Sequence, residues 1–163
     1  MKKIVLLSDT HNSLDTRIIK HLKKSDEIWH AGDIGSFEII DKLSEYAPTT
    51  AVFGNIDNAE IRKSLKKTIT FKCEEIKILM THIGGYPGNY NHEIQDILKK
   101  NKPNIFISGH SHILKVIFDK KYNLLHMNPG AIGDYGIHKF KTIICFNITL
   151  DKIHDLRVIQ YER

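Results

Sequence analysis

The fold of this chain is decided close to its first residue by the stretch Ile4-Val5-Leu6-Leu7-Ser8-Asp9-Thr10-His11. Four consecutive apolar residues predict a buried β-strand, and an aspartate and a histidine follow where that strand ends. Alternate strand side chains share a face, so Asp9 and His11 can converge on one centre. By itself the pair is ambiguous, because an acid and a histidine after a strand also serve as a helix cap and a surface residue.

Length and composition set the class of protein. The chain has 163 residues, of which 41% are apolar and 26% charged, and this fits one domain spanning residues 1–163 with a full hydrophobic core. The formal net charge is +5, and this positive balance favours anionic substrates in a general way. The lysines are spread along the chain in small groups, which is typical of solvated faces. No apolar run approaches the length of a membrane span, so we expect a soluble cytoplasmic protein with no membrane partner.

The two cysteines, Cys73 and Cys145, lie far apart in the sequence and in strand-like runs. No CxxC pair exists, so neither a zinc ribbon nor a redox motif is supported. We expect both thiols to be reduced, buried and inert.

Strands and helices alternate in the first third of the chain, which predicts parallel βαβ units. The predicted strands are Lys3–Leu7, Glu27–His30 and Thr50–Phe53, and the predicted helices are Ser13–Lys24 and a second one marked by Phe37, Ile40 and Leu43.

The remainder is richer in strands. The predicted elements are a hairpin of Thr68–Cys73 and Ile76–Met80, a helix His92–Lys100, a strand Ile105–Ser108, a hairpin of Val116–Asp119 and Asn123–Met127, and strands Thr142–Ile148 and His154–Gln160. The expected fold class is α/β, with two facing mixed β-sheets in a sandwich flanked by helices.

Five of the predicted strands end in residue types that bind metals. These are Asp9 and His11, then Asp33, Asn55 and His82, and finally His110 and His112. Loops at the carboxyl ends of strands in open α/β sheets meet in one crevice, so seven such side chains are expected to converge. A pair of divalent cations suits neutral imidazoles and ionised carboxylates together. The mixed oxygen and nitrogen donors suit Mn²⁺, Fe, Zn²⁺, Ni²⁺ or Co²⁺, and the absence of thiolates argues against a structural zinc site.

The sequence leaves the roles of several other polar residues undecided. Asp57 is expected either to orient a ligand or substrate or to cap the next helix. His30 is expected to be buried behind the site, and His126 is a strand residue that can face either way. His21, His92, His138 and His154 stand in polar contexts and are expected at the surface.

The motifs together resemble the calcineurin-like metallophosphoesterase superfamily, and most of all its YfcE-type phosphodiesterase branch. They occur in the order typical of the family: Asp9-Thr10-His11, Gly32-Asp33, Gly54-Asn55-Ile56-Asp57, Thr81-His82, Gly109-His110-Ser111-His112 and Asn128-Pro129-Gly130. The resemblance implies a fold of facing mixed sheets and two metal sites. Asp9, His11 and His112 would hold the first ion, Asn55, His82 and His110 the second, and Asp33 would bridge them.

The resemblance also implies the reaction. Two ions roughly 3.5–4 Å apart acidify a water molecule and clamp the phosphoryl oxygens of a small phosphodiester substrate. We expect a metal-dependent phosphodiesterase that favours Mn²⁺, with Asp33, Asn55 and Asp57 as the residues acting in catalysis. The alternatives are a non-catalytic scaffold of the same fold that binds metal or proteins, and a nuclease. A nuclease would need a basic, aromatic-lined groove, so nucleic acid is not the expected partner; homo-oligomerisation stays open.

One position departs from the superfamily pattern. Many members carry a histidine directly after the asparagine, where resemblance would make it the proton donor to the leaving group. Ile56 stands there in this chain. The YfcE-type branch commonly lacks that histidine, so the match to the branch stands. The departure predicts poor cleavage of esters whose leaving group needs a proton.

Overall fold

The computed structural model describes residues 1–163 and arranges ten strands in two five-stranded sheets. The first sheet has the order β10-β9-β1-β2-β3. Strands β1, β2 and β3 run parallel to one another. On the other side of β1, β9 pairs antiparallel with β1, and β10 pairs antiparallel with β9. Its strands are β1 (Lys2–Leu7), β2 (Glu27–His30), β3 (Thr49–Ala51), β9 (Phe140–Thr149) and β10 (Lys152–Glu162).

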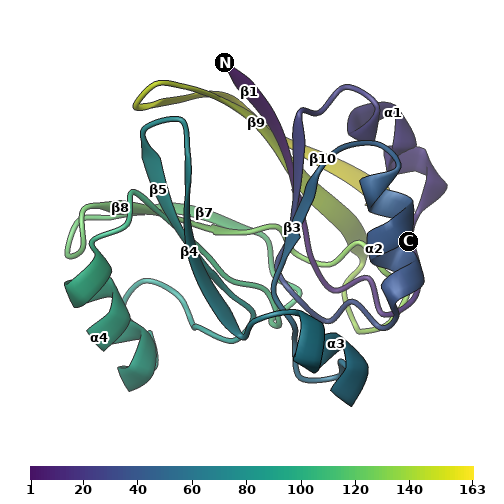
Figure 1. Cartoon of the computed structure of the whole chain (residues 1–163), viewed down its shortest axis with the longest axis horizontal. Coiled ribbons are helices and arrows are strands. Elements are labelled where there is room, and N and C mark those ends of the chain that lie inside the picture. Colours follow the sequence, from purple (N-terminus) through teal and green to yellow (C-terminus); the bar gives the residue numbers. More distant parts are fainter.

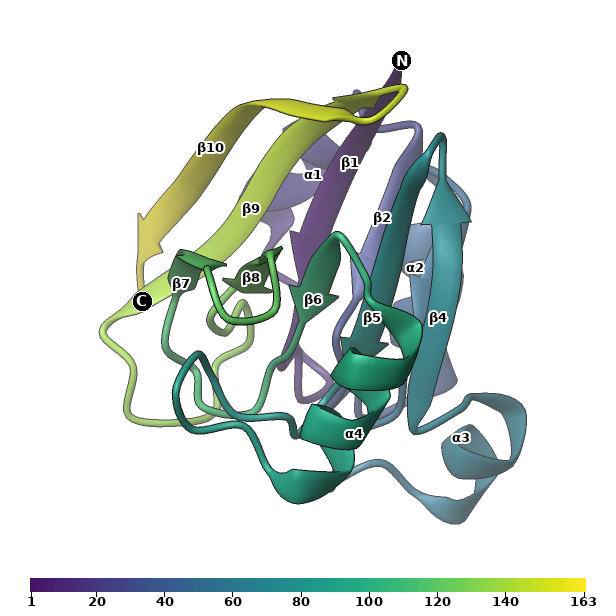
Figure 2. The same ribbon diagram turned by 90° about the vertical axis from the view of Figure 1, so that its left-hand side faces the viewer.

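The second sheet has the order β4-β5-β6-β8-β7, with β5, β6 and β8 parallel and an antiparallel strand at each edge. Both sheets are therefore mixed, which confirms the predicted fold class. Figure 2 shows β1 of the first sheet and β5 of the second running toward the same edge of the molecule. The strands of the second sheet are β4 (Thr68–Cys73), β5 (Ile76–Thr81), β6 (Ile105–Ile107), β7 (Lys115–Asp119) and β8 (Leu124–Asn128).

Helices cover the outer faces of both sheets (Figure 1). Helices α1 (Ile19–Leu22) and α2 (Phe37–Ser44) pack on the first sheet, where Leu22 and Leu43 join the buried cluster that includes Val5 and Leu7. Helix α4 (His92–Asn101) packs on the second sheet through Ile94 and Leu98. No helix combines the length and apolar character needed to cross a membrane.

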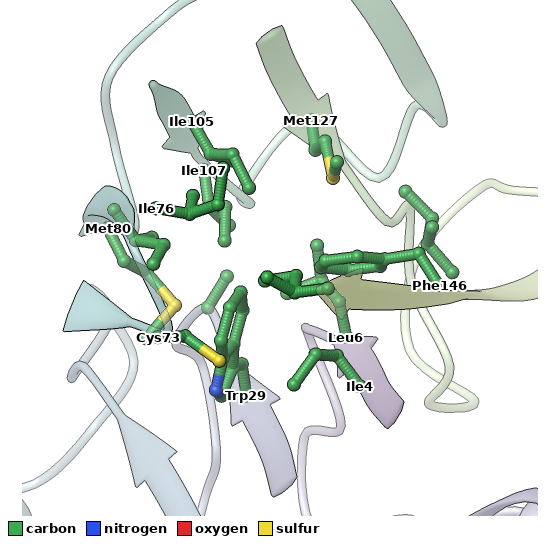
Figure 3. Close-up of a cluster of buried hydrophobic side chains, with 14 of the residues drawn as sticks. Ile4, Leu6, Trp29, Cys73, Ile76, Met80, Ile105, Ile107, Met127 and Phe146 are labelled. Carbon is green, nitrogen blue, oxygen red and sulfur yellow. The ribbon is translucent and has the colours of Figure 1, made fainter. Parts of the chain in front are cut away.

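The main core lies between the two sheets (Figure 3). Alternation along β1 explains this arrangement, because Ile4 and Leu6 face the other sheet while Val5 and Leu7 face the helices. Trp29 is fully buried in this core and meets the Phe71 and Phe146 rings edge-on, at centroid distances of 5.0 and 5.6 Å. Figure 3 shows Trp29 below Met80 and beside Cys73. Both cysteines are free and buried, as predicted.

The predicted helix Ser13–Lys24 is wrong in its extent. The structure has only a 3₁₀ turn, Thr16–Ile18, followed by the single turn of α1. The helix does not begin before Asp15, because the preceding segment is bonded to the loop after β2. In this contact the Asn12 N–H donates to Ile34 O. Asp15 then begins the 3₁₀ turn by accepting from the Arg17 N–H.

No bounds were predicted for the helix that follows Asp57. Helix α3 (Ala59–Ser64) follows β3, and Asn58 caps it by accepting from the Ile61 N–H at 3.0 Å. Ile61 is its one buried residue, so it carries no apolar periodicity for a sequence to display. The third strand also ends earlier than expected, at Ala51, because Val52 is paired beyond it only in an isolated bridge with Lys66.

Candidate metal centre

The seven predicted ligand residues lie in loops at the carboxyl ends of β1, β2, β3, β5 and β6. These loops are bonded to one another through their backbones. The Asp9 N–H donates to Gly32 O, the His11 N–H to Asp33 O, and the Gly109 N–H to His82 O, at 2.9–3.0 Å. These bonds join the loop after β1 to the loop after β2, and the loop after β6 to the loop after β5.

Five of these residues adopt a left-handed backbone conformation that is uncommon for residues other than glycine. Such strain persists where surrounding bonds enforce it, and it is concentrated at functional sites. The φ angles are 57° for Asp9, 45° for His11, 54° for Asp33, 67° for His110 and 57° for His112.

Asp9, His11 and His112 form a first group whose ligand atoms all lie within 4.8 Å of one another. Asp9 Oδ1 is 3.1 Å from His112 Nε2 and 3.9 Å from His11 Nε2. The other oxygen, Oδ2, accepts from the Ser8 hydroxyl and the His110 N–H. Asp9 Oδ1 and His11 Nε2 are buried without hydrogen-bond partners. Leaving such atoms unpaired costs roughly 1–3 kcal/mol each, and a cation between them removes that cost.

Asp33, His82 and His110 form the second group, also within 4.8 Å. His82 Nδ1 donates to Ala31 O at 2.7 Å, which turns Nε2 toward Asn55 Oδ1 at 3.1 Å and Asp33 Oδ1 at 3.2 Å. If His82 is neutral, the lone pair on Nε2 faces these two oxygen atoms, which are acceptors too. The contact becomes favourable when Nε2 carries a proton or when a cation lies between the three atoms. Burial lowers the pKa of His82, but the Asp33 and Asp9 carboxylates outweigh burial and raise it overall.

Asp33 lies between the two groups. Its Oδ1 is 3.2 Å from His82 Nε2, and its Oδ2 is 3.5 Å from His11 Nε2. The Ile56 N–H also donates to Oδ1 at 3.0 Å. Gly54 permits this arrangement, because a Cβ atom at that position would lie 2.0 Å from Asp33 Oδ1.

Asp57 is 3% exposed and its carboxylate faces backbone amides. Oδ1 accepts from the Ile34 and Gly35 N–H groups at 2.8 Å, and Oδ2 accepts from the Gly54 N–H at 2.7 Å. The predicted alternative of a helix cap is wrong, since Asn58 caps α3. Asp57 instead ties the loop that carries Asp33 to the loop that carries Asn55.

His30 is fully buried, as predicted. Its Nδ1 accepts from the Gly32 N–H at 3.1 Å, so Nε2 carries the proton and donates to the Thr10 hydroxyl at 3.0 Å. Burial lowers the pKa of His30 to about 3, which keeps the ring neutral. Thr10 in turn donates to Ile34 O at 2.9 Å, linking the first motif to the second.

His138 was expected at the surface, but it is half-buried and supports the first group. Its Nε2 donates to Gly133 O at 3.1 Å, and its Nδ1 lies 3.3 Å from His112 Nδ1. Since a carbonyl only accepts, His138 Nδ1 is the acceptor and His112 Nδ1 the donor. That bond leaves the His112 Nε2 lone pair facing Asp9. Nothing in the spacing of His138 in the sequence signals this role.

The surroundings of the site are open on the side of Asn55. A cavity of about 310 Å³ is lined by Asn55, His82 and the cationic side chains of Arg62 and Lys67. Arg62 is held by the Asn55 and Asp57 carbonyl oxygens, each at 2.7 Å. Ile56 is 42% exposed, and its apolar side chain has no proton to donate to a leaving group.

A comparison with protein families gives one match, covering residues 1–151, to the calcineurin-like phosphoesterase superfamily domain. Among curated proteins, a probable metallophosphoesterase from Methanocaldococcus jannaschii is 30% identical over 135 residues, covering 78% of this chain and 67% of the relative.

Solved structures share the fold. Vps29 from Entamoeba histolytica, complexed with zinc, superposes with a TM-score of 0.75 at 16% identity, covering 98% of each chain. A structure described as a novel archaeal phosphodiesterase superposes with a TM-score of 0.69 at 21% identity, covering 96% of this chain and 99% of the other.

Proposed function

The chain belongs to the calcineurin-like phosphoesterase superfamily, and from that premise we propose that it is a phosphodiesterase with two metal ions. The observation that carries the proposal is the placement of Asp33, whose two oxygens face two separate groups of ligand atoms. A binuclear site needs one such shared carboxylate. We further propose that the chain is a single cytoplasmic domain, since its two buried thiols are free.

We assign the first ion to Asp9, His11 and His112, the second to Asn55, His82 and His110, and Asp33 to both. Two divalent cations, when bound, acidify water and withdraw charge from the phosphoryl oxygens of the substrate. Two carboxylates and one amide oxygen are hard donors, and four imidazoles are borderline ones. This mixture suits first-row ions, and we favour Mn²⁺.

The protein's own part is to fix each donor atom. His82 is oriented by Ala31 O, and His112 by His138. Such partners select the tautomer and set the ring direction of a ligand histidine. Asp57 has a positioning role, since it holds the two loops of Asp33 and Asn55 together.

The substrate class follows from Ile56. General acid help to a leaving group is worth about 10²–10⁴-fold, and no acid stands at this position. We therefore propose that the enzyme cleaves diesters with a stable leaving anion much faster than alkyl diesters.

A protein-binding scaffold is the second candidate. Ile117 and Phe118 on the edge strand β7 are 42% and 57% exposed, which would suit such a role. The buried, unpaired ligand atoms favour a metal site over a purely protein-binding one, and metal-dependent hydrolysis distinguishes the enzyme from a scaffold that only binds metal.

The test is hydrolysis of bis(p-nitrophenyl) phosphate and of p-nitrophenyl phosphate by protein loaded with Mn²⁺, next to the metal-free protein. We expect metal-dependent cleavage with a higher kcat/KM for the diester. An Asp33→Asn variant serves as the control for contaminating enzymes. Cleavage that persists in that variant or after removal of metal would refute the proposal.

A further inference from the structure

A second cavity adjoins the site on the side of His110. It has a volume of about 220 Å³ and lies between the loop after β5 and the loop after β6. Its lining includes His110 itself, Tyr86, Ser111, Lys115, His126 and Asn128, and no carboxylate. A group bound at His110 can therefore extend directly into this space.

Lys115 supplies the positive charge of the cavity. Its ammonium lies 3.6 Å from the centroid of the Tyr86 ring, rather than against a carboxylate. The cation–π contact holds the ammonium in place while its N–H bonds stay available. Lys115 thus offers charge and donors without a competing anion.

His126 forms part of the cavity wall. Its side chain is fully buried, and its ring lies 5.4 Å from the Phe106 ring and 5.9 Å from the Tyr90 ring, measured between centroids. Neither ring nitrogen is accessible from the cavity, so His126 shapes the wall and does not itself bind a ligand there. Neither the proposed metal ligands nor their supports use this residue.

Ser111 adds a second donor. Its hydroxyl oxygen accepts from the Ile113 N–H and from the Asn128 side-chain amide, both at 3.2 Å. Its own proton therefore remains free for a ligand. The amide of Asn128 is occupied as well, since it also donates to Gly109 O at 2.8 Å.

We propose that this cavity binds a second oxyanion, carried on one organic arm of the phosphodiester substrate. Lys115 pairs with that oxyanion, and the Ser111 hydroxyl donates a hydrogen bond to it. The substrate class is then a phosphodiester with a carboxylate or a further phosphate on one arm. This inference rests on the proposed phosphodiesterase function and states which class of phosphodiester the enzyme prefers.

The test uses matched p-nitrophenyl diesters whose second aryl arm carries a carboxylate, a phosphate or an uncharged carboxamide. We expect the Mn²⁺-loaded protein to prefer the anionic arms over the carboxamide by about tenfold or more in kcat/KM. The ranking of carboxylate against phosphate identifies the source of the oxyanion.

Lys115→Gln is expected to remove the preference while leaving the carboxamide ester within about twofold of the wild type, and Lys115→Arg to retain most of it. Lys121→Gln is the matched control, because Lys121 also lies over a tyrosine ring but on the exposed β7–β8 turn. Equal rates for all three esters in the wild type, or equal losses for all three in Lys115→Gln, would overturn the inference.

A binding readout separates the subsite from the reaction. Calorimetry with non-hydrolysable phosphonate analogues of the carboxylate and carboxamide esters measures the same preference without turnover. If no ester is cleaved, the proposed function fails. In that case tighter binding of the carboxylate analogue, lost in Lys115→Gln, still supports the subsite, and equal binding refutes it.

Discussion

Asp57→Asn is expected to destabilise the protein out of proportion to the size of the change. The Asp57 carboxylate accepts three backbone N–H groups and is 3% exposed. An asparagine oxygen can keep the bonds from Ile34 and Gly35, but its NH₂ group then faces the Gly54 N–H. One buried donor loses its acceptor, at about 1–3 kcal/mol, and the other two bonds lose their ionic character. We expect the free energy of unfolding to fall by about 2–4 kcal/mol.

The assay is urea unfolding of the metal-free protein, followed by fluorescence of Trp29, the one tryptophan, which is fully buried in the core. Asp151→Asn is the matched control, since Asp151 is exposed at the turn between β9 and β10, and it should change stability by less than about 0.5 kcal/mol. A loss below about 1 kcal/mol in Asp57→Asn would refute the idea that this carboxylate holds the two loops together.

Three further predictions concern the ligands, the leaving group and acid stability. Asp33→Asn should reduce kcat at saturating Mn²⁺ more than Asp9→Asn, because Asp33 faces both ligand groups; equal losses would remove it as the bridge. Ile56→His should narrow the gap in kcat/KM between aryl and alkyl diesters, and a wild type without such a gap would show that another group supplies the proton. Burial and then Lys115 lower the pKa of His126 to about 4, while the unfolded chain takes up this proton near pH 6.5. His126 should therefore contribute about 3 kcal/mol to the loss of stability as the pH drops from 6.5 to 4, so His126→Asn should lose less than the wild type by about that amount; parallel urea-unfolding curves for both proteins would contradict this.

The strands and the ligand motifs could be predicted because their signals are local. The continuous apolar run in β1 predicts a strand buried on both faces, as Leu6 and Leu7 show by pointing to opposite cores. The ends of parallel strands share one edge of a sheet, so Asp9 and Asp33 converge once the first sheet is placed. His82 joins them because β5 of the second sheet runs toward the same edge of the molecule (Figure 2).

Features decided by non-local bonds were missed. Leu14 and Ile18 fit a helical period, yet backbone bonds to the loop after β2 keep the chain out of helix until Thr16. His138 reaches His112 only because its loop folds back, with the Gly133 N–H donating to Asp9 O. The isolation of His126 depends on which neighbours surround it, and no sequence pattern records that.

In the proposed mechanism two ions act together at this site. A Mn²⁺ titration of the metal-free protein tests this, with bound ions per chain and hydrolysis of bis(p-nitrophenyl) phosphate recorded at each step. We expect binding to reach two ions per chain and activity to rise to its maximum only with the second ion. Full activity at one ion per chain, or activity without bound metal, would contradict it.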